Sequence, residues 1–171
     1  MPAVAIYIVG LMIMIAEGAV LFGLGIETMA LHSPVALTMV LGLRRQFESS
    51  ALTLALLIPP IEWLVAGVPG VYGLGLVVLF FLLRGVRTSL QQGWGVARAT
   101  AAAMAAVVHI AVMMMVLAVM GLGSEPMIAA MARAILWSAP VVAIMTVVVG
   151  RSMEQMGQIW DPRGQRSGVS Y

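Results

Sequence analysis

The fold is decided by one stretch, residues 49–73, which reads SSALTLALLIPPIEWLVAGVPGVYG. An apolar run follows it as far as Arg84 and Arg87. A single carboxylate, Glu62, stands within apolar sequence, with a double proline just before it and a glycine-rich turn just after it. Apolar runs that flank such a turn predict a tight helical hairpin, and the carboxylate makes this hairpin unusual for a membrane.

Composition predicts an all-α integral membrane protein. Hydrophobic residues make up 62% of the 171 positions and charged residues 9%, and mean hydropathy is +1.06; a soluble domain carries roughly 25% charged residues. The length allows about six spans of roughly 20 residues with short loops. The absence of cysteine excludes disulfides, thiolate metal sites and thiol nucleophiles. The start, Met1-Pro2-Ala3-Val4, has no basic segment, so we expect the first apolar run to be kept as a helix.

The apolar runs predict six transmembrane helices. We expect them at about 3–24, 34–43, 49–65, 71–83, 99–120 and 127–149. Residues 1–150 would then form one six-helix transmembrane domain, and residues 151–171 a polar, flexible cytoplasmic tail. Even if the second helix starts as early as Met29, it reaches only roughly 22 Å, and the third helix reaches roughly 25 Å, against a hydrocarbon core of about 30 Å. Because Pro59 and Pro60 each remove a backbone donor, we also expect a kink or break near Ile58.

The positions of the arginines predict the orientation. All nine cationic residues are arginines, and six alternating spans place every one except Arg133 on the same side of the membrane. This is the cytoplasmic side under the positive-inside rule, so both termini should be cytoplasmic in a multi-pass membrane protein. A five-span arrangement would split the arginine clusters between the two sides. The small net charge of +2 gives no indication of a nucleic-acid partner. The arginines on the cytoplasmic side are Arg44, Arg45, Arg84, Arg87, Arg98, Arg151, Arg163 and Arg166.

No reaction chemistry is visible in the sequence. We find no Ser/His/Asp set at a recognisable spacing, no glycine-rich phosphate loop and no cluster of His, Asp and Glu at metal-ligand spacing. We therefore expect a protein that is not an enzyme and that holds neither a cofactor nor a metal.

Four ionisable residues fall within or beside the spans. Glu17 is either a substrate or proton site or a protonated glutamate in a helix-packing hydrogen bond, and its isolation favours the second interpretation. We expect Glu62 to brace the turn rather than bind a ligand, and His109 to be a neutral, hydrogen-bonded core residue. Arg133 either snorkels outward or pairs with Glu17 or Glu125.

Residues 33–87 and the six-span plan resemble the family of the rod shape-determining protein MreD. The resemblance consists of a proline that begins the second span, Pro34, an acidic residue that closes the third, Glu62, and Gly70 eight residues later, preceded by Pro69. Three positions depart from the family pattern: Glu62 replaces an aspartate, Val35 replaces an acidic residue, and residues 58–61 replace a Gly-Leu-Leu approach.

The resemblance implies a non-enzymatic, multi-pass protein of the bacterial inner membrane. It would be a component of the cell-elongation machinery, which determines rod shape and directs peptidoglycan synthesis. Such a protein binds the bitopic protein MreC and helps to couple cytoplasmic MreB filaments to the peptidoglycan synthase. Its partner-binding and structural residues would include Pro34, Glu62, Pro69 and Gly70.

An alternative from another class is the substrate-binding S-component of an energy-coupling factor transporter. The MreD family resembles S-components in fold, so an S-component-like bundle suits both hypotheses. A row of small residues, Ala97, Ala101 and Ala105, is able to serve docking on a coupling subunit, but the polar groups that would converge on a substrate are sparse. A pore is a weaker alternative because no span has a polar stripe.

Overall fold

The structure, a computed structural model, describes residues 3–23, 32–44, 46–65, 68–91 and 95–160. Expectations for residues 24–31, for Arg45 and for residues 161–171, including Arg163 and Arg166, lie outside this described part. Within it the fold is all-α, as predicted, with no strand. The helices are α1 (Ala3–Gly23), α2 (Ser33–Leu43), α3 (Phe47–Leu64), α4 (Val71–Gln91), α5 (Gly95–Val119) and α6 (Glu125–Trp160).

Three helices of the described chain are long and apolar enough to cross a membrane: α1, α4 and α5, over Val4–Leu21, Val71–Thr88 and Ala99–Val119. Two further apolar stretches are shorter, α2 and Leu136–Arg151 of α6. The 18 residues of α3 include two glutamates and two prolines, which lower its hydropathy. The features of a membrane protein are therefore present in the fold.

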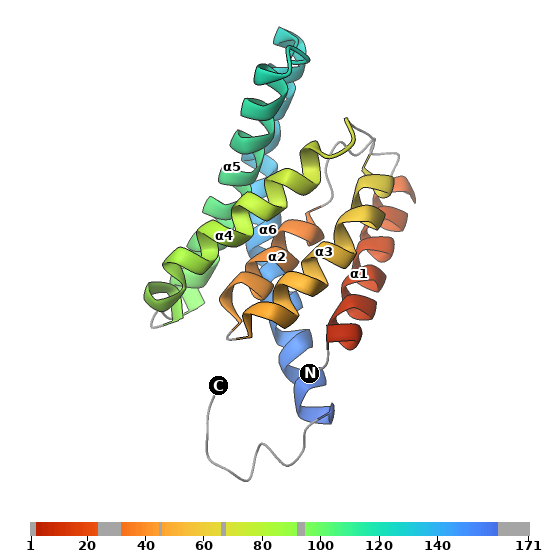
Figure 1. The fold of residues 1–171 in the computed structure, drawn as a ribbon, viewed down its shortest axis with the longest axis vertical. Helices are drawn as coiled ribbons and strands as arrows, with labels where there is room; N and C mark the ends of the chain where they lie inside the picture. The colour runs from red at the N-terminus through yellow and green to blue at the C-terminus, as the bar shows by residue number, and fades with distance from the viewer. Residues whose placement is uncertain (1–2, 24–31, 45, 66–67, 92–94, 161–171) are drawn as a thin grey trace.

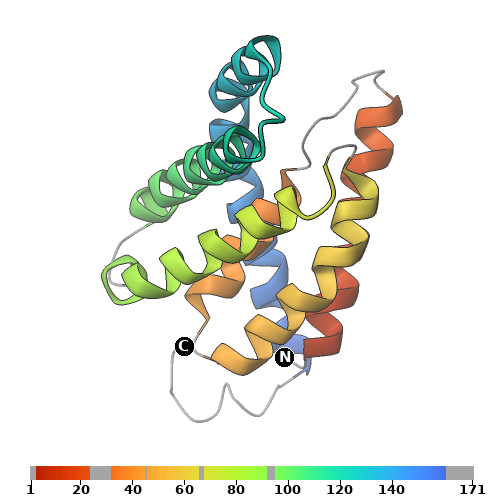
Figure 2. The ribbon, with the colours of Figure 1, turned by 45° about the horizontal axis from the view of Figure 1, so that its top comes forward.

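Successive helices run in alternating directions, so that the start of α1 and the end of α6 lie at the same end of the bundle (Figure 1). Helices α1 and α3 lie side by side, and α5 and α6 form a long hairpin that extends past the other helices at the opposite end. The turned view separates the α5–α6 hairpin from the α1–α3 pair, with α2 and α4 between them (Figure 2).

Helix α2 is the centre of the bundle. It packs against each of the other five helices, and nine of its 11 residues are buried. Pro34 lies in its first turn, where a missing backbone N–H breaks no helical hydrogen bond. At 1.5 Å per residue α2 is only roughly 16 Å long, so a helix too short to cross a bilayer alone is enclosed by longer ones.

Of the kink or break expected near Ile58, the break is wrong, because α3 continues through Pro59 and Pro60. Leu57 and Ile61, on either side of the prolines, are 0% and 1% exposed. Packing of this face on the neighbouring helices holds the backbone helical despite the lost donors. The helix ends where the Val65 N–H donates to the Ile61 carbonyl oxygen at 2.9 Å.

The expected end of the fourth span at Leu83 is also wrong. Helix α4 continues to Gln91, so Arg84 and Arg87 are helical rather than in a loop. The Arg84 guanidinium donates a hydrogen bond to the Arg44 carbonyl oxygen, just past the end of α2, and its Cζ lies 5.1 Å from the Phe47 ring centroid. The charge thus meets the negative end of a helix and an aromatic face.

The last two helices also exceed their predicted limits. Helix α5 begins at Gly95 rather than Ala99, and α6 continues past Val149 to Trp160 without ending at Pro140. Residues 151–160, the first part of the predicted polar tail, are therefore helical.

Candidate functional site

Side chains of three helices meet at the N-terminus of α2. Glu17 comes from α1, His32 and Ser33 form the start of α2, and Ser138 comes from α6. We call these four residues the polar junction. Ser33 and Ser138 are buried, at 1% and 6% exposed.

The Glu17 carboxylate caps α2. The backbone N–H of His32 donates to Oε1 and that of Ser33 donates to Oε2, both at 2.8 Å. The residue at the N-cap position, His32, makes no side-chain cap of its own, so a carboxylate from another helix satisfies the free donors and meets the positive end of the helix dipole. The hydrogen bond between helices that we expect of Glu17 is therefore present, and the protonation of its carboxyl group stays a prediction.

The His32 ring connects α1 to α6. Its Nδ1 lies 3.2 Å from Glu17 Oε1, and its Nε2 lies 3.2 Å from the Ser138 hydroxyl oxygen. The tautomer with a proton on Nδ1 donates to Glu17 and accepts from Ser138. A continuous chain of hydrogen bonds therefore ties together α1, α2 and α6.

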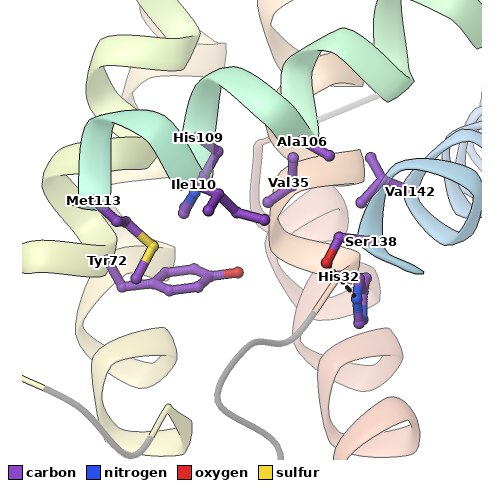
Figure 3. A pocket seen from close by; sticks show the side chains of 9 residues that line it. All are labelled: His32, Val35, Tyr72, Ala106, His109, Ile110, Met113, Ser138 and Val142. Carbon is purple, nitrogen blue, oxygen red and sulfur yellow. Dashed lines mark hydrogen bonds between the residues drawn. The ribbon is translucent and has the colours of Figure 1, made fainter. Parts of the chain in front are cut away.

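A cavity of about 20 Å³ lies beside the polar junction. One water molecule needs a cavity of about 10–15 Å³, measured as the space open to its centre, so this cavity has room for one water. The Tyr72 hydroxyl points across the cavity toward Ser138 and His32, and His109 lies on the same side of the cavity as Tyr72 (Figure 3). The lining residues are His32, Val35, Tyr72, Ala106, His109, Ile110, Met113, Ser138 and Val142.

His109 is a core residue, as predicted, with 1% of its surface exposed. Its ring centroid lies 4.6 Å from that of Tyr72, and a Cβ added at Gly75 would lie 3.3 Å from Nε2. The predicted hydrogen bonding is not complete, because Nε2 has no partner within the described part of the chain.

The order carboxylate, imidazole, hydroxyl in Glu17, His32 and Ser138 is that of an acyl-transfer triad. A substrate pocket usually measures about 300–1,000 Å³, whereas the space beside Ser138 is about 20 Å³. An acyl group has no room at the hydroxyl, so this geometry fits a structural connection better than a nucleophile. No three His, Asp or Glu side chains of the described residues lie close enough together to hold a metal ion.

A second carboxylate fixes the turn between α3 and α4. Glu62 Oε2 accepts the Gly70 backbone N–H at 2.9 Å, and Oε1 accepts that of Gly73. Gly70, which follows Pro69, has a φ of +88°, a conformation that residues with a Cβ adopt only at a cost. The prediction that Glu62 braces this turn is confirmed, and we call Glu62, Pro69, Gly70 and Gly73 the braced turn.

Arg133 takes no part in either site. Its side chain is exposed, and its Nε donates to the Ala129 carbonyl oxygen of its own helix at 3.3 Å. Of the two predicted partners, Glu17 is held by α2 and Glu125 forms no ion pair with Arg133 in the described residues. Neither predicted pairing is present among the described residues, and outward snorkelling stays a prediction.

Sequence reasoning missed His32, Ser138 and Gly73. His32 had one usable signal, its position just before the Ser33-Pro34 start of a helix. Ser138 had none, because a serine in an apolar helix is common and its partner lies 106 positions away. Comparison with known protein families, with curated proteins and with solved structures finds no match to this chain.

Proposed function

We propose that this protein is a non-enzymatic, multi-pass scaffold of the bacterial inner membrane, of the MreD type. It acts in the cell-elongation complex, where it binds MreC and through MreC connects the peptidoglycan synthase with MreB. In this proposal all six helices lie in the membrane and both termini are cytoplasmic.

The observation that carries the proposal is the braced turn. The three residues in which this part of the sequence resembles the MreD family, Glu62, Pro69 and Gly70, form one unit, in which the carboxylate holds the backbone of the glycine. A carboxylate held by two backbone donors is a costly feature for an apolar hairpin. The spacing of eight residues between acid and glycine therefore has a physical function here, and this supports the proposal.

The direction of the helices supports the six-span arrangement. The short α2 and the proline-containing α3 alternate in direction with the three long apolar helices (Figure 1). If all six cross the bilayer, Arg44, Arg84 and Arg87 gather at one end, together with the start of α1 and the end of α6. This is the distribution that the positive-inside rule expects of a cytoplasmic side.

One observation favours the S-component alternative: polar groups do converge on a cavity, from His32, Tyr72, His109 and Ser138. Its size decides against that hypothesis, because a vitamin needs several hundred Å³ and the cavity holds about 20 Å³. A scaffold needs no such space.

The two hypotheses are separated by affinity purification of the tagged protein from its native membrane in mild detergent, followed by mass spectrometry. Recovery of MreC with a peptidoglycan synthase is the expected result. Recovery of a coupling subunit with paired ATPases, or tight binding of a vitamin by the purified protein, would instead identify a transporter subunit.

A further inference from the structure

An apolar groove runs between α1 and α3 on the side of the bundle away from the α5–α6 hairpin. Its volume is about 420 Å³, and it is lined by Leu11, Ile15, Pro59, Pro60, Trp63 and Leu64. Trp63 is 95% exposed, so it does not fold over the groove. In a membrane, apolar exposure alone says nothing about what covers a surface.

The backbone of α3 distinguishes this groove from an ordinary lipid-facing surface. In a helix the N–H of each residue donates to the carbonyl four positions earlier. Pro59 and Pro60 have no N–H, so this donor is missing for the carbonyl oxygens of Ala55 and Leu56. Both residues are exposed, and the only donor in the groove lining is the Trp63 indole N–H.

These two carbonyls lie at the middle of the membrane if α3 spans it. The midpoint of the 18-residue helix falls between Ala55 and Leu56, roughly 12 Å from either end. Water and lipid headgroups do not reach that depth, and an unsatisfied backbone group in hydrocarbon costs several kcal/mol. An acyl chain cannot supply a donor, but a polar side chain on a neighbouring helix can.

We propose that the α1–α3 groove binds the single transmembrane helix of a partner chain, which places a hydroxyl or amide side chain against the carbonyls of Ala55 and Leu56. The apolar lining supplies packing and the carbonyls fix the register of the partner. This inference rests on the proposed scaffold function, because it names the surface on which the transmembrane helix of the bitopic partner MreC would bind.

The test is photo-crosslinking in native membranes of the source cells. p-Benzoylphenylalanine replaces Leu56, which lies about one helical turn before Pro60 of the groove and is 51% exposed, or as a control Leu82 of α4, which is 52% exposed. The expected result is an adduct at position 56 with the transmembrane segment of one single-span protein and no such adduct at position 82. Lipid adducts alone, equal adducts at both positions, or an adduct with a second copy of this chain would each overturn the inference.

A second variant tests whether the carbonyls of Ala55 and Leu56 contribute to binding, rather than where the partner binds. Pro59→Ala with Pro60→Ala restores both N–H donors in a helix that is already continuous, so the fold should persist. The restored donors satisfy the carbonyls internally, and the yield of the position-56 adduct should fall by about threefold for each hydrogen bond lost by the partner. An unchanged yield would show that the carbonyls play no part in binding.

The outcomes separate this inference from the proposed function. A single-span partner other than MreC at position 56 retains the groove and removes the elongation-complex assignment. If MreC co-purifies but only lipid is crosslinked at position 56, the elongation-complex assignment is retained and the groove is removed as the binding surface.

Discussion

Glu17 and His32 are held together twice, through the His32 backbone N–H at 2.8 Å and through the ring Nδ1 at 3.2 Å. A single carboxylate thus satisfies both the end of the central helix and the side chain that reaches α6. Few single substitutions in this chain would remove as many contacts between helices.

We expect Glu17→Ala to lower the free energy of unfolding by about 1–3 kcal/mol, because two backbone donors of α2 lose their acceptor inside the bundle. Glu17→Gln should cost less, since an amide keeps one accepting oxygen. Thermal or denaturant unfolding in detergent measures both. The matched control is Glu125→Gln, at an exposed helix start, which should change little; equal effects at positions 17 and 125 would contradict the capping role.

Glu62→Ala should loosen the braced turn. The free energy of unfolding should fall by about 1–3 kcal/mol, because the N–H groups of Gly70 and Gly73 lose their acceptor. Gly70→Ala should cost about 1–2 kcal/mol by a different route, the strain of a Cβ at positive φ. Both variants should disturb rod shape and reduce recovery of MreC in cells. Normal rods with normal complex recovery would count against the proposed function, whatever the stability.

Replacing two glycines of α4 by alanine should change the free energy of unfolding in opposite directions. A Cβ at Gly73 would lie 2.7 Å from Ile58 Cγ2 and 2.8 Å from Glu62 Oε1, whereas one at Gly85 meets nothing within 4 Å. Gly73→Ala should destabilise by about 1–3 kcal/mol through overpacking, and Gly85→Ala should stabilise by up to about 1 kcal/mol through helix propensity. Unfolding midpoints of the two variants, compared with the wild type, decide the sign of each; stabilisation by Gly73→Ala would mean that the hairpin opens to make room.

The order of Glu17, His32 and Ser138 makes serine reactivity worth measuring directly. Because the hydroxyl has only about 20 Å³ beside it, we expect a fluorophosphonate probe not to label the full-length protein in membranes. A labelled band that disappears in both Ser138→Ala and His32→Ala would replace the non-enzymatic proposal with a hydrolase.

The natural absence of cysteine allows the topology to be tested without a reference mutant. Ser124→Cys, in the turn before α6, and Gln46→Cys, before α3, both introduce an exposed thiol. An impermeant maleimide added to spheroplasts should label position 124 at once and position 46 only after lysis. Labelling of both from the same side would rule out the six-span arrangement.

The helices were predictable because hydrophobicity decides them, whereas their ends were not. Arg84 and Arg87 read as the start of a loop, but the end of α2 supplies a carbonyl acceptor for Arg84 and lets α4 continue. Pro59 and Pro60 read as a break, but the burial of Leu57 and Ile61 outweighs two missing donors. In each case a tertiary contact overrides a correct local preference.

The candidate sites divide in the same way. The braced turn was accessible from sequence because Glu62 and Gly70 are eight residues apart and joined by one turn. The polar junction was not, since it needs His32 and Ser138 to meet across 106 positions, a distance over which helix periodicity carries no information.

That separation has a consequence for how the protein is made. Helix α2 is too short to be a stable span alone, and its contact with α6 cannot form until the ribosome has passed Ser138. In the proposed six-span arrangement, the central helix would therefore stay in the translocon or against α1 and α3 while the last third of the chain is synthesised. In that arrangement the bundle is completed only by its last helix, and a chain that stops before α6 leaves one face of α2 without its partner.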